Sequence, residues 1–456
     1  MSARTAAQKA VALAEKLGAR EAEAYVTSAT ERMVDFHDEI EICRTSRLAG
    51  IGVTVVVGKK KGFFSYSSIE RREVESTVKT ALSIAKASEP DPDWKSFPTR
   101  TGKRPVTAVF DKKTAELEED HLVRGAASVI DFVKSKDKRL SLVASALGTS
   151  SVMTSISNSY GCNLQRRSTG AAFFVRVKAE EAGKKGISDE GIQARSWREL
   201  SLEDKADDAA DRAIKMMNAR QISSRKTSVV ISNDLMARVL NVMFSGTINA
   251  EAVQRGRSPW IGKIGKQVAS DNFNLVDDGT RRAGLGTRAF DDEGIPQKTT
   301  PIIVKGVLQS YLYDNYTAAK DRLSSTGNAR RVGSGTFGFG RPYTQTPVPA
   351  PTNLVLNNGE SSLDELITET GEGLYVVDSI GEWLSNPISG LLNATVTNAF
   401  EIRKGDLADP VKGVIVSGNF FEMIMKHMDL IGNDIKNSGN VYAPSVRVSE
   451  MTVAGE

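Results

Sequence analysis

The chain has 456 residues, of which 40% are hydrophobic and 25% charged, the composition of a globular protein of about two or three domains. Its net charge of +4 and pI near 8.8 are a mild basic excess and do not indicate a nucleic-acid-binding protein. No segment approaches about 18 consecutive apolar residues, and the N-terminus lacks the apolar core of a signal peptide. We therefore expect a protein that does not span a membrane.

The first part of the chain, residues 1–90, predicts a helix, a set of strands and a second helix. Helical spacing of apolar residues covers 4–17, Gly18 ends that helix, and the second helix is expected over 69–87. Apolar and β-branched runs predict short strands at 24–26, 33–36, 40–43, 52–57 and 63–66. The proline-rich stretch that follows, 91–105, is expected to be a linker.

The second part, residues 106–222, repeats the order of helix, strands and helix. Its helices are expected near 116–136 and 201–219, and strands dominate from 140 to 177. We find no residue-by-residue repeat between the two parts, so we infer a shared architecture only.

The third part, residues 223–456, is the largest and the richest in glycine and proline. It begins with a buried strand at 229–231 and a short apolar helix at 234–243, followed by many strands separated by turn residues. The sequence therefore predicts an α+β fold. Two N-terminal units of helices and antiparallel strands precede a large, mostly antiparallel β domain.

The two cysteines, Cys43 and Cys162, are far apart and form no C-x-x-C pair. They indicate a reducing, cytoplasmic setting and argue against a disulfide scaffold or a cysteine-ligated metal site. Each is interpreted as a buried or incidental thiol rather than a nucleophile.

The histidines do not form a zinc motif. A catalytic zinc needs three protein ligands, and peptidases commonly place two histidines one helical turn apart. His37, His121 and His427 are the only histidines, and none has another within five residues. Each is better explained as a surface or half-buried imidazole.

Other catalytic patterns are weak. The G-x-S-x-G pattern of serine hydrolases is absent. Residues 333–338 fit G-x-G-x-x-G, but Pro342 and the segment after it forbid the helix that a dinucleotide site requires. Lys59, Lys60 and Lys61 lie between two glycines and predict a hairpin tip.

Two acidic clusters, at 277–278 and 291–293, each precede a glycine. They could supply metal ligands or an acid/base pair, but Asp before Gly is also common turn chemistry. We favour the turn interpretation.

Several strings, in the same order, resemble the TldD/PmbA family of metallopeptidases, and the resemblance covers nearly the whole chain. They are S-P-W-I-G-K-I-G at 258–265, V-D-D-G-T at 276–280, F-D-D-E-G at 290–294, G-V-L-Q-S-Y-L at 306–312, S-T-G-N at 325–328, S-N-P-I-S-G at 385–390 and I-G-N-D at 431–434.

The resemblance implies two related subunits, of which the TldD type carries an H-E-x-x-x-H zinc helix after the first strand of the third unit. The matching stretch here, 235–243, reads L-M-A-R-V-L-N-V-M and has neither His nor Glu. Residues 439–444, where the catalytic subunit is expected to supply a Cys ligand, contain no Cys. The chain is thus similar to the TldE/PmbA type, so no catalytic or metal-binding residue is carried over to it.

The resemblance further implies a heterodimer with a TldD-type catalytic subunit that holds the zinc, while this chain binds no cofactor. The complex would cleave unfolded or short peptides. An extended peptide could pair with a strand edge, and Asn328, Arg330 and Arg331 are candidate substrate contacts, although the arginines also fit ordinary surface charge. Two alternatives stay open, namely an active hydrolase with unconventional ligands and a non-enzymatic, peptide-binding homodimer.

Overall fold

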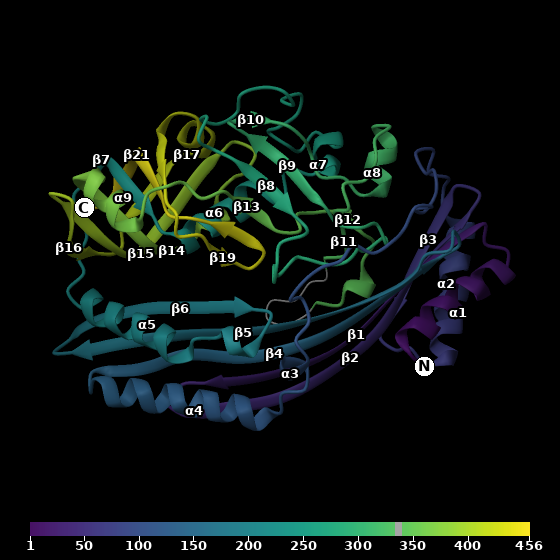
Figure 1. The fold of residues 1–456 in the computed structure, drawn as a ribbon, viewed down its shortest axis with the longest axis horizontal. Coiled ribbons are helices and arrows are strands. Elements are labelled where there is room, and N and C mark those ends of the chain that lie inside the picture. The colour runs from purple at the N-terminus through teal and green to yellow at the C-terminus, as the bar shows by residue number, and fades with distance from the viewer. Residues whose placement is uncertain (333–339) are drawn as a thin grey trace.

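The N-terminal half forms one long, curved antiparallel sheet (Figure 1). A computed structural model describes residues 1–332 and 340–456. The first unit contains α1 (Ala3–Lys16), β1 (Glu21–Phe36), β2 (Ile40–Val57), β3 (Lys60–Tyr66) and α2 (Arg71–Ala87). The second contains α3 (Lys112–Ala115), α4 (Glu119–Lys136), β4 (Leu140–Asn158), β5 (Asn163–Glu181), β6 (Lys184–Ala194), η1 (Trp197–Glu199) and α5 (Leu202–Met216).

The two N-terminal units share this sheet because β1 pairs with β4 along almost its whole length. The strand order is β3-β2-β1-β4-β5-β6, so each unit contributes three adjacent strands. The short strands expected at 24–26 and 33–36 are one continuous strand, as are those expected at 40–43 and 52–57.

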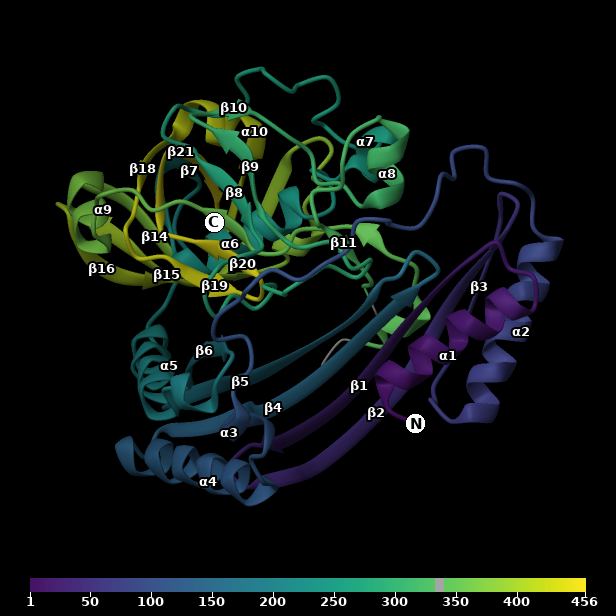
Figure 2. The same cartoon turned by 45° about the vertical axis from the view of Figure 1, so that its right-hand side comes forward.

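The two faces of the sheet have different partners, and β1 shows the division. Ala24 and Val26 pack against α1 and α2, and Val34 packs in the core under α4 and α5. Glu23 and Tyr25 contact Arg331 and Asp292, which belong to the C-terminal domain. Because side chains alternate along a strand, the helices cover one face and the C-terminal domain covers part of the other (Figure 2).

Gly62 and Gly186 hold equivalent places in the two units. Each is the third residue of its strand and follows two lysines. A Cβ at Gly62 would lie 2.1 Å from the carbonyl oxygen of Ala81 in α2, and one at Gly186 would lie 2.0 Å from that of Ala213 in α5. The Lys-Lys-Gly string is thus a residue-level repeat between the two units, which corrects the inference of a shared architecture only.

The described part of the C-terminal domain contains two large sheets and the two-stranded sheet β11-β12. The large sheets have the strand orders β10-β9-β8-β13-β20-β19 and β14-β7-β21-β17-β15-β16, and β18 also pairs with β21 in the second. The first part of the domain contains β7 (Arg225–Ile231), α6 (Asn233–Phe244), α7 (Ala250–Gln254), β8 (Leu275–Asp278), β9 (Thr299–Val304), β10 (Val307–Leu308), α8 (Asn315–Lys320), β11 (Ala329–Arg330), η2 (Pro342–Thr344), β12 (Val348–Pro349) and β13 (Leu354–Leu356). The second part contains α9 (Leu363–Thr370), β14 (Glu372–Ile380), η3 (Glu382–Leu384), β15 (Leu391–Arg403), β16 (Asp406–Val411), β17 (Ile415–Asn419), α10 (Phe420–Glu422), η4 (Met423–His427), β18 (Met428–Ile431), β19 (Lys436–Ser438), β20 (Val441–Ala443) and β21 (Val446–Ala454).

Helix α6 lies in the core of this domain. Phe244, at its end, stacks on Trp260 with ring centroids 5.2 Å apart and also contacts Phe273 and Phe420. β14 pairs with both β7 and β15, which closes part of the second sheet on itself. The four aromatic side chains belong to the large apolar core of the domain. Most strand pairs are antiparallel, and the α+β fold expected from the sequence is confirmed.

The segment before α3 joins the two halves of the molecule. The backbone N–H of Gly102 donates to the Gly294 carbonyl at 3.0 Å, and that of Arg104 donates to the Ala289 carbonyl at 2.9 Å. The expected linker is therefore held against the C-terminal domain. None of the helices in the described part of the chain is long and apolar enough to cross a membrane.

Candidate functional site

Helix α6 follows the first strand of the C-terminal domain, as the sequence predicted. Ser232 caps its first turn, because its Oγ accepts from the Leu235 N–H at 3.4 Å. Most of the helix is buried, with Leu235, Met236, Val239, Leu240 and Met243 inside the domain core.

The polar side of α6 carries one dominant feature, Arg238. Its Nε donates to Asp234 at 3.1 Å and its Nη1 to Glu382 at 2.6 Å, while Nη2 donates to Asp378. Burial by itself lowers the pKa of Arg238, but the three carboxylates outweigh burial and raise it. A permanent cation therefore already lies among the three acidic groups beside this helix.

The residues around α6 do not fit the zinc that the family implies. Zinc requires imidazole, thiolate or carboxylate ligands converging on one point. His37 lies at the β1–β2 hairpin beside Glu41, and His121 is exposed on α4. The Nδ1 atom of His427 lies 3.5 Å from the Oγ atom of Ser449. Within the described ranges, no group of three or more His, Cys, Asp or Glu side chains could hold a metal ion.

A buried ionic cluster lies where the long sheet meets the C-terminal domain, and Asp292 is at its centre. The Asp292 carboxylate pairs with Arg166 of β5 and with Arg288, and it accepts the Arg331 backbone N–H at 2.7 Å. Burial favours the neutral acid, but Arg288 and Arg166 hold the pKa of Asp292 well below its usual range. We call Asp291, Asp292, Glu293, Arg166, Arg288, Arg331 and Glu23 the junction cluster.

Two of its other carboxylates, those of Asp291 and Glu293, have no ion pair with a cation among the described residues. Asp291 accepts the backbone N–H groups of Glu293 and Ile295, both at 2.9 Å, and that of Ala329 at 3.1 Å. Burial nevertheless raises the pKa of Asp291 to about 7. Burial, together with the nearby carboxylates of Asp314 and Asp291, also raises the pKa of Glu293 well above its ordinary value.

The turn interpretation of the acidic clusters describes only part of their role. Residues 291–294 do form a turn, in which Gly294 has a φ of 88°. However, Asp277, Asp291, Asp292 and Glu293 are buried, and no local pattern in the sequence indicates this burial. Their partners, Tyr25 and Arg166 among them, are too distant in sequence to be found by spacing.

The three candidate substrate contacts lie together at β11, in different surroundings. Asn328 is buried and donates to Asp277 at 2.6 Å. Arg331 is buried too, pairs with Glu23, and lies over the Tyr25 ring at 4.8 Å.

Arg330 is half-buried, and in the described residues its guanidinium forms no ion pair. Burial and the nearby Arg288 lower its pKa to about 10. Substrate contact stays a prediction for all three residues, and Arg330 is the best placed of them.

Two other sequence features can be placed. Cys43 is exposed and Cys162 is buried, and burial raises the pKa of the Cys162 thiol to about 12, which makes it a poor nucleophile. The G-x-G-x-x-G string at 333–338 lies outside the described residues.

A shallow groove runs beside the first half of β9. β10 pairs only with Ile303 and Val304, so the outer edge of Thr299–Pro301 has no partner strand among the described residues. The groove has a volume of about 450 Å³ and is lined by Lys298, Thr299, Thr300, Pro301, Val304, Gln309, Ser310 and Thr326. We call it the β9 groove.

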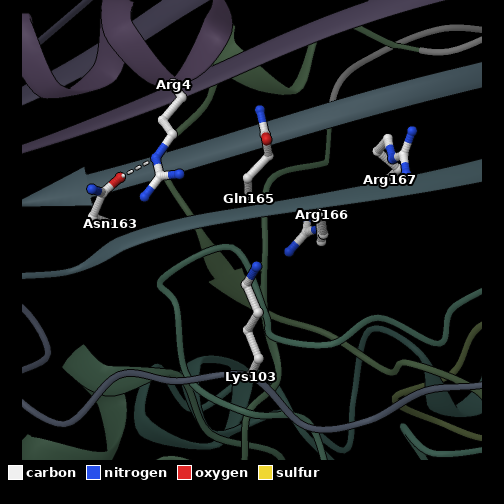
Figure 3. Close-up of a pocket in the computed structure, with 6 residues that line it drawn as sticks. All are labelled: Arg4, Lys103, Asn163, Gln165, Arg166 and Arg167. Carbon is white, nitrogen blue, oxygen red and sulfur yellow. Dashed lines mark hydrogen bonds between the residues drawn. The ribbon is translucent and has the colours of Figure 1, made fainter.

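A second recess lies between α1, the linker and β5 (Figure 3). It has a volume of about 330 Å³ and is lined by Arg4, Lys103, Asn163, Gln165, Arg166 and Arg167. We call it the basic pocket.

Comparison with known families finds matches to three consecutive segments of the chain. Residues 22–85, 112–217 and 224–455 match domain 1, the central domain and the C-terminal domain of the PmbA/TldA metallopeptidases. The chain belongs to the PmbA/TldD family.

Relatives of this PmbA/TldD protein span its full length. It is 27% identical to an uncharacterized protein of Methanocaldococcus jannaschii, over 96% of this chain and 97% of that protein. It is 25% identical to the metalloprotease PmbA homologue of Haemophilus influenzae, over 99% of this chain and 96% of that protein. The crystal structure of TldE from Thermococcus kodakarensis superposes with a TM-score of 0.90 at 21% identity, covering 99% of this chain and 100% of that one, and shows that the fold is the same.

Proposed function

We propose that this chain is the non-catalytic subunit of a two-subunit metallopeptidase of the TldD/TldE type, which processes or degrades unfolded or short peptides. The observation that carries the proposal is helix α6. At the place where the family's catalytic subunit has a zinc motif, this chain has a buried apolar helix whose polar side is occupied by Arg238 and its three carboxylates. A TldD-type partner would supply the zinc, and this chain would bind no cofactor.

In this proposal the two subunits enclose a substrate chamber, which this chain completes, and the β9 groove helps to hold the substrate. An extended peptide can add to an open strand edge through main-chain hydrogen bonds, which tolerate many sequences. The free outer edge of Thr299–Pro301 supports this route. Pro301 lacks an N–H, so pairing would begin or end beside it.

An apolar surface on the C-terminal domain supports a partner subunit. Trp383 and Leu384 of η3 are 57% and 80% exposed, and Ile380, Ile388 and Leu391, from the adjoining strand ends and loop, are each about half exposed. We call these five residues the apolar patch. Contiguous exposed apolar side chains are typical of protein interfaces, and a buried aromatic anchor commonly contributes much of the binding energy.

We also propose a cytoplasmic location. Its support is the pair of free thiols, one of them exposed, which suits a reducing compartment.

The test is reconstitution. The purified chain, a TldD-type partner and their mixture are each assayed for cleavage of an unstructured peptide and for zinc content. We expect no cleavage and no stoichiometric zinc from the lone chain, and cleavage by the mixture that exceeds that of the partner alone.

Zinc-dependent cleavage by the lone chain would overturn the proposal and favour an unconventional hydrolase. A stable homodimer that neither binds the partner nor increases its activity would instead favour a non-enzymatic scaffold.

A further inference from the structure

The basic pocket gathers cationic side chains from three separate parts of the chain. Arg4 comes from α1, Lys103 from the linker, and Arg166 and Arg167 from β5 (Figure 3). The lining described for this pocket contains neither a carboxylate nor an aromatic ring. Its chemistry is therefore that of a receptor for an anion.

Three of these cations have no carboxylate partner within the described part of the chain. Arg4 donates from Nε to the amide oxygen of Asn163 at 3.2 Å, and the guanidinium of Arg167 lies over the Phe110 ring at 4.4 Å. Lys103 is exposed on the linker and forms no ion pair there. Like charges gathered in one recess repel one another, and a bound anion would relieve that repulsion.

The position of Arg4 strengthens this argument. It lies in the first turn of α1, which contains no acidic residue. A cation near a helix N-terminus opposes the helix dipole, whereas an anion there is stabilised by it. Arg4 and the helix end thus add positive potential on the same side of the pocket.

Arg166 gives the pocket a rigid wall. Its side chain is 10% exposed, and its Nη1 donates to the carbonyl oxygens of Phe290 and Asp291 while Nη2 pairs with Asp292. Because Arg166 already pairs with Asp292, the cations of the pocket that have no carboxylate partner among the described residues are Arg4, Lys103 and Arg167. A ligand held here would also lie beside the junction cluster.

The lining also limits the class of ligand. A volume of about 330 Å³ is at the small end of ligand sites, and side chains without aromatic rings offer no surface for stacking a nucleobase. Arginine and lysine side chains around a small polar recess suit a carboxylate.

We propose that the basic pocket binds a carboxylate of the peptide substrate, either its C-terminus or an acidic side chain. This inference rests on the proposed function, because it takes the ligand to be a peptide.

The experiment uses the full chain and isothermal titration calorimetry with three probes. They are N-acetyl-tetraalanine with a free C-terminus, the same peptide as its amide, and N-acetyl-Ala-Glu-Ala-Ala amide. We expect at least one carboxylate-bearing peptide to bind about tenfold more tightly than the neutral amide. Tighter binding of the peptide with the free C-terminus would indicate a site for a terminal carboxylate, and tighter binding of the Glu-containing amide would indicate a site for a side-chain carboxylate.

The Arg4→Gln/Lys103→Gln variant should lose this preference. It should bind all three peptides with the affinity that the wild type has for the neutral amide. The Lys113→Gln/Arg124→Gln variant is the matched control, because it removes the same charge from exposed residues elsewhere and should keep the preference. Equal binding of all three peptides by the wild type, or a preference that survives in the first variant, overturns the carboxylate site but leaves peptide binding intact. Failure of every peptide to bind would overturn the substrate-holding role and the carboxylate site together.

Discussion

Glu23 and Arg331 form a buried ion pair across the junction between the long sheet and the C-terminal domain, although 308 residues separate them in sequence. The Arg331 side chain also donates to the Gln345 carbonyl at 2.6 Å and lies over Tyr25. The pair therefore helps to fix the C-terminal domain against the concave face of the sheet.

Removing one member of this pair should destabilise the protein. Arg331→Met leaves the Glu23 carboxylate buried without its cation, and we expect a loss of about 3–5 kcal/mol in the free energy of unfolding. Urea denaturation followed by circular dichroism measures the change. The Glu23→Gln/Arg331→Met double variant should recover part of the loss, and a single variant as stable as the wild type would refute the role of the pair.

Asp277 should make stability depend on pH. Burial raises the pKa of Asp277 to about 7, although Asn328 and Thr352 donate hydrogen bonds to it. An unfolded Asp releases its proton near pH 4, so between about pH 4 and 7 the folded chain binds more protons at this residue than the unfolded chain does. The contribution of Asp277 to stability is therefore greatest at low pH, falls through this range and is constant above it.

The Asp277→Asn variant tests this dependence because it cannot titrate. Its free energy of unfolding, relative to that of the wild type, should rise between about pH 5 and pH 7 and change little between pH 7 and 8. A relative stability that does not vary with pH would show that Asp277 titrates at its ordinary pKa.

Arg238 should be required for the stability of the C-terminal domain. Arg238→Leu leaves the carboxylates of Asp378 and Glu382 without their cation, and Glu382 is only 3% exposed. We expect the free energy of unfolding to fall by about 3 kcal/mol or more. Asp234→Asn is the control, because its carboxylate is about half exposed and its loss should cost less than about 1 kcal/mol.

The apolar patch should be required for binding a partner subunit. Leu384→Asp places a charge where the proposed interface excludes water, so we expect at least a hundredfold loss of affinity for a TldD-type subunit, or about 3 kcal/mol. Analytical ultracentrifugation of the mixture measures it. Leu323→Asp, at an equally apolar but separate exposed position, should bind normally, and normal binding by Leu384→Asp would place the interface elsewhere.

Substitution of the glycine in either Lys-Lys-Gly string should lower the melting temperature. Gly62→Ala and Gly186→Ala each bring a methyl group into the backbone of the helix packed on the strand. Overpacking of this kind typically costs about 1–3 kcal/mol, so both melting temperatures should fall by similar amounts. Gly246→Ala meets no atom within 4 Å and should leave the melting temperature nearly unchanged.

The order of elements could be predicted from sequence, but strand lengths could not. Thr27, Ser28 and Arg32 interrupt the apolar pattern of β1, so the sequence suggested two short strands. Pairing with β2 and β4 on both sides keeps the whole segment extended, because long-range pairing outweighs local propensity.

The site was predictable where its chemistry is local. The lack of His and Glu in 235–243 can be read directly from the sequence, and the expectation that this chain binds no zinc stays a prediction. The junction cluster and the basic pocket could not be found this way. Their members come from β1, β5, the linker and the C-terminal domain, and only the folded chain brings them together.

The shared N-terminal sheet has a consequence for how the chain can be divided. A cut between its two helix-and-strand units would expose the inner edges of β1 and β4, strands of 16 and 19 residues that otherwise pair with each other. Long unpaired edges recruit other chains, so fragments separated there would be prone to self-association. The natural unit of expression, truncation or fusion is the whole sheet.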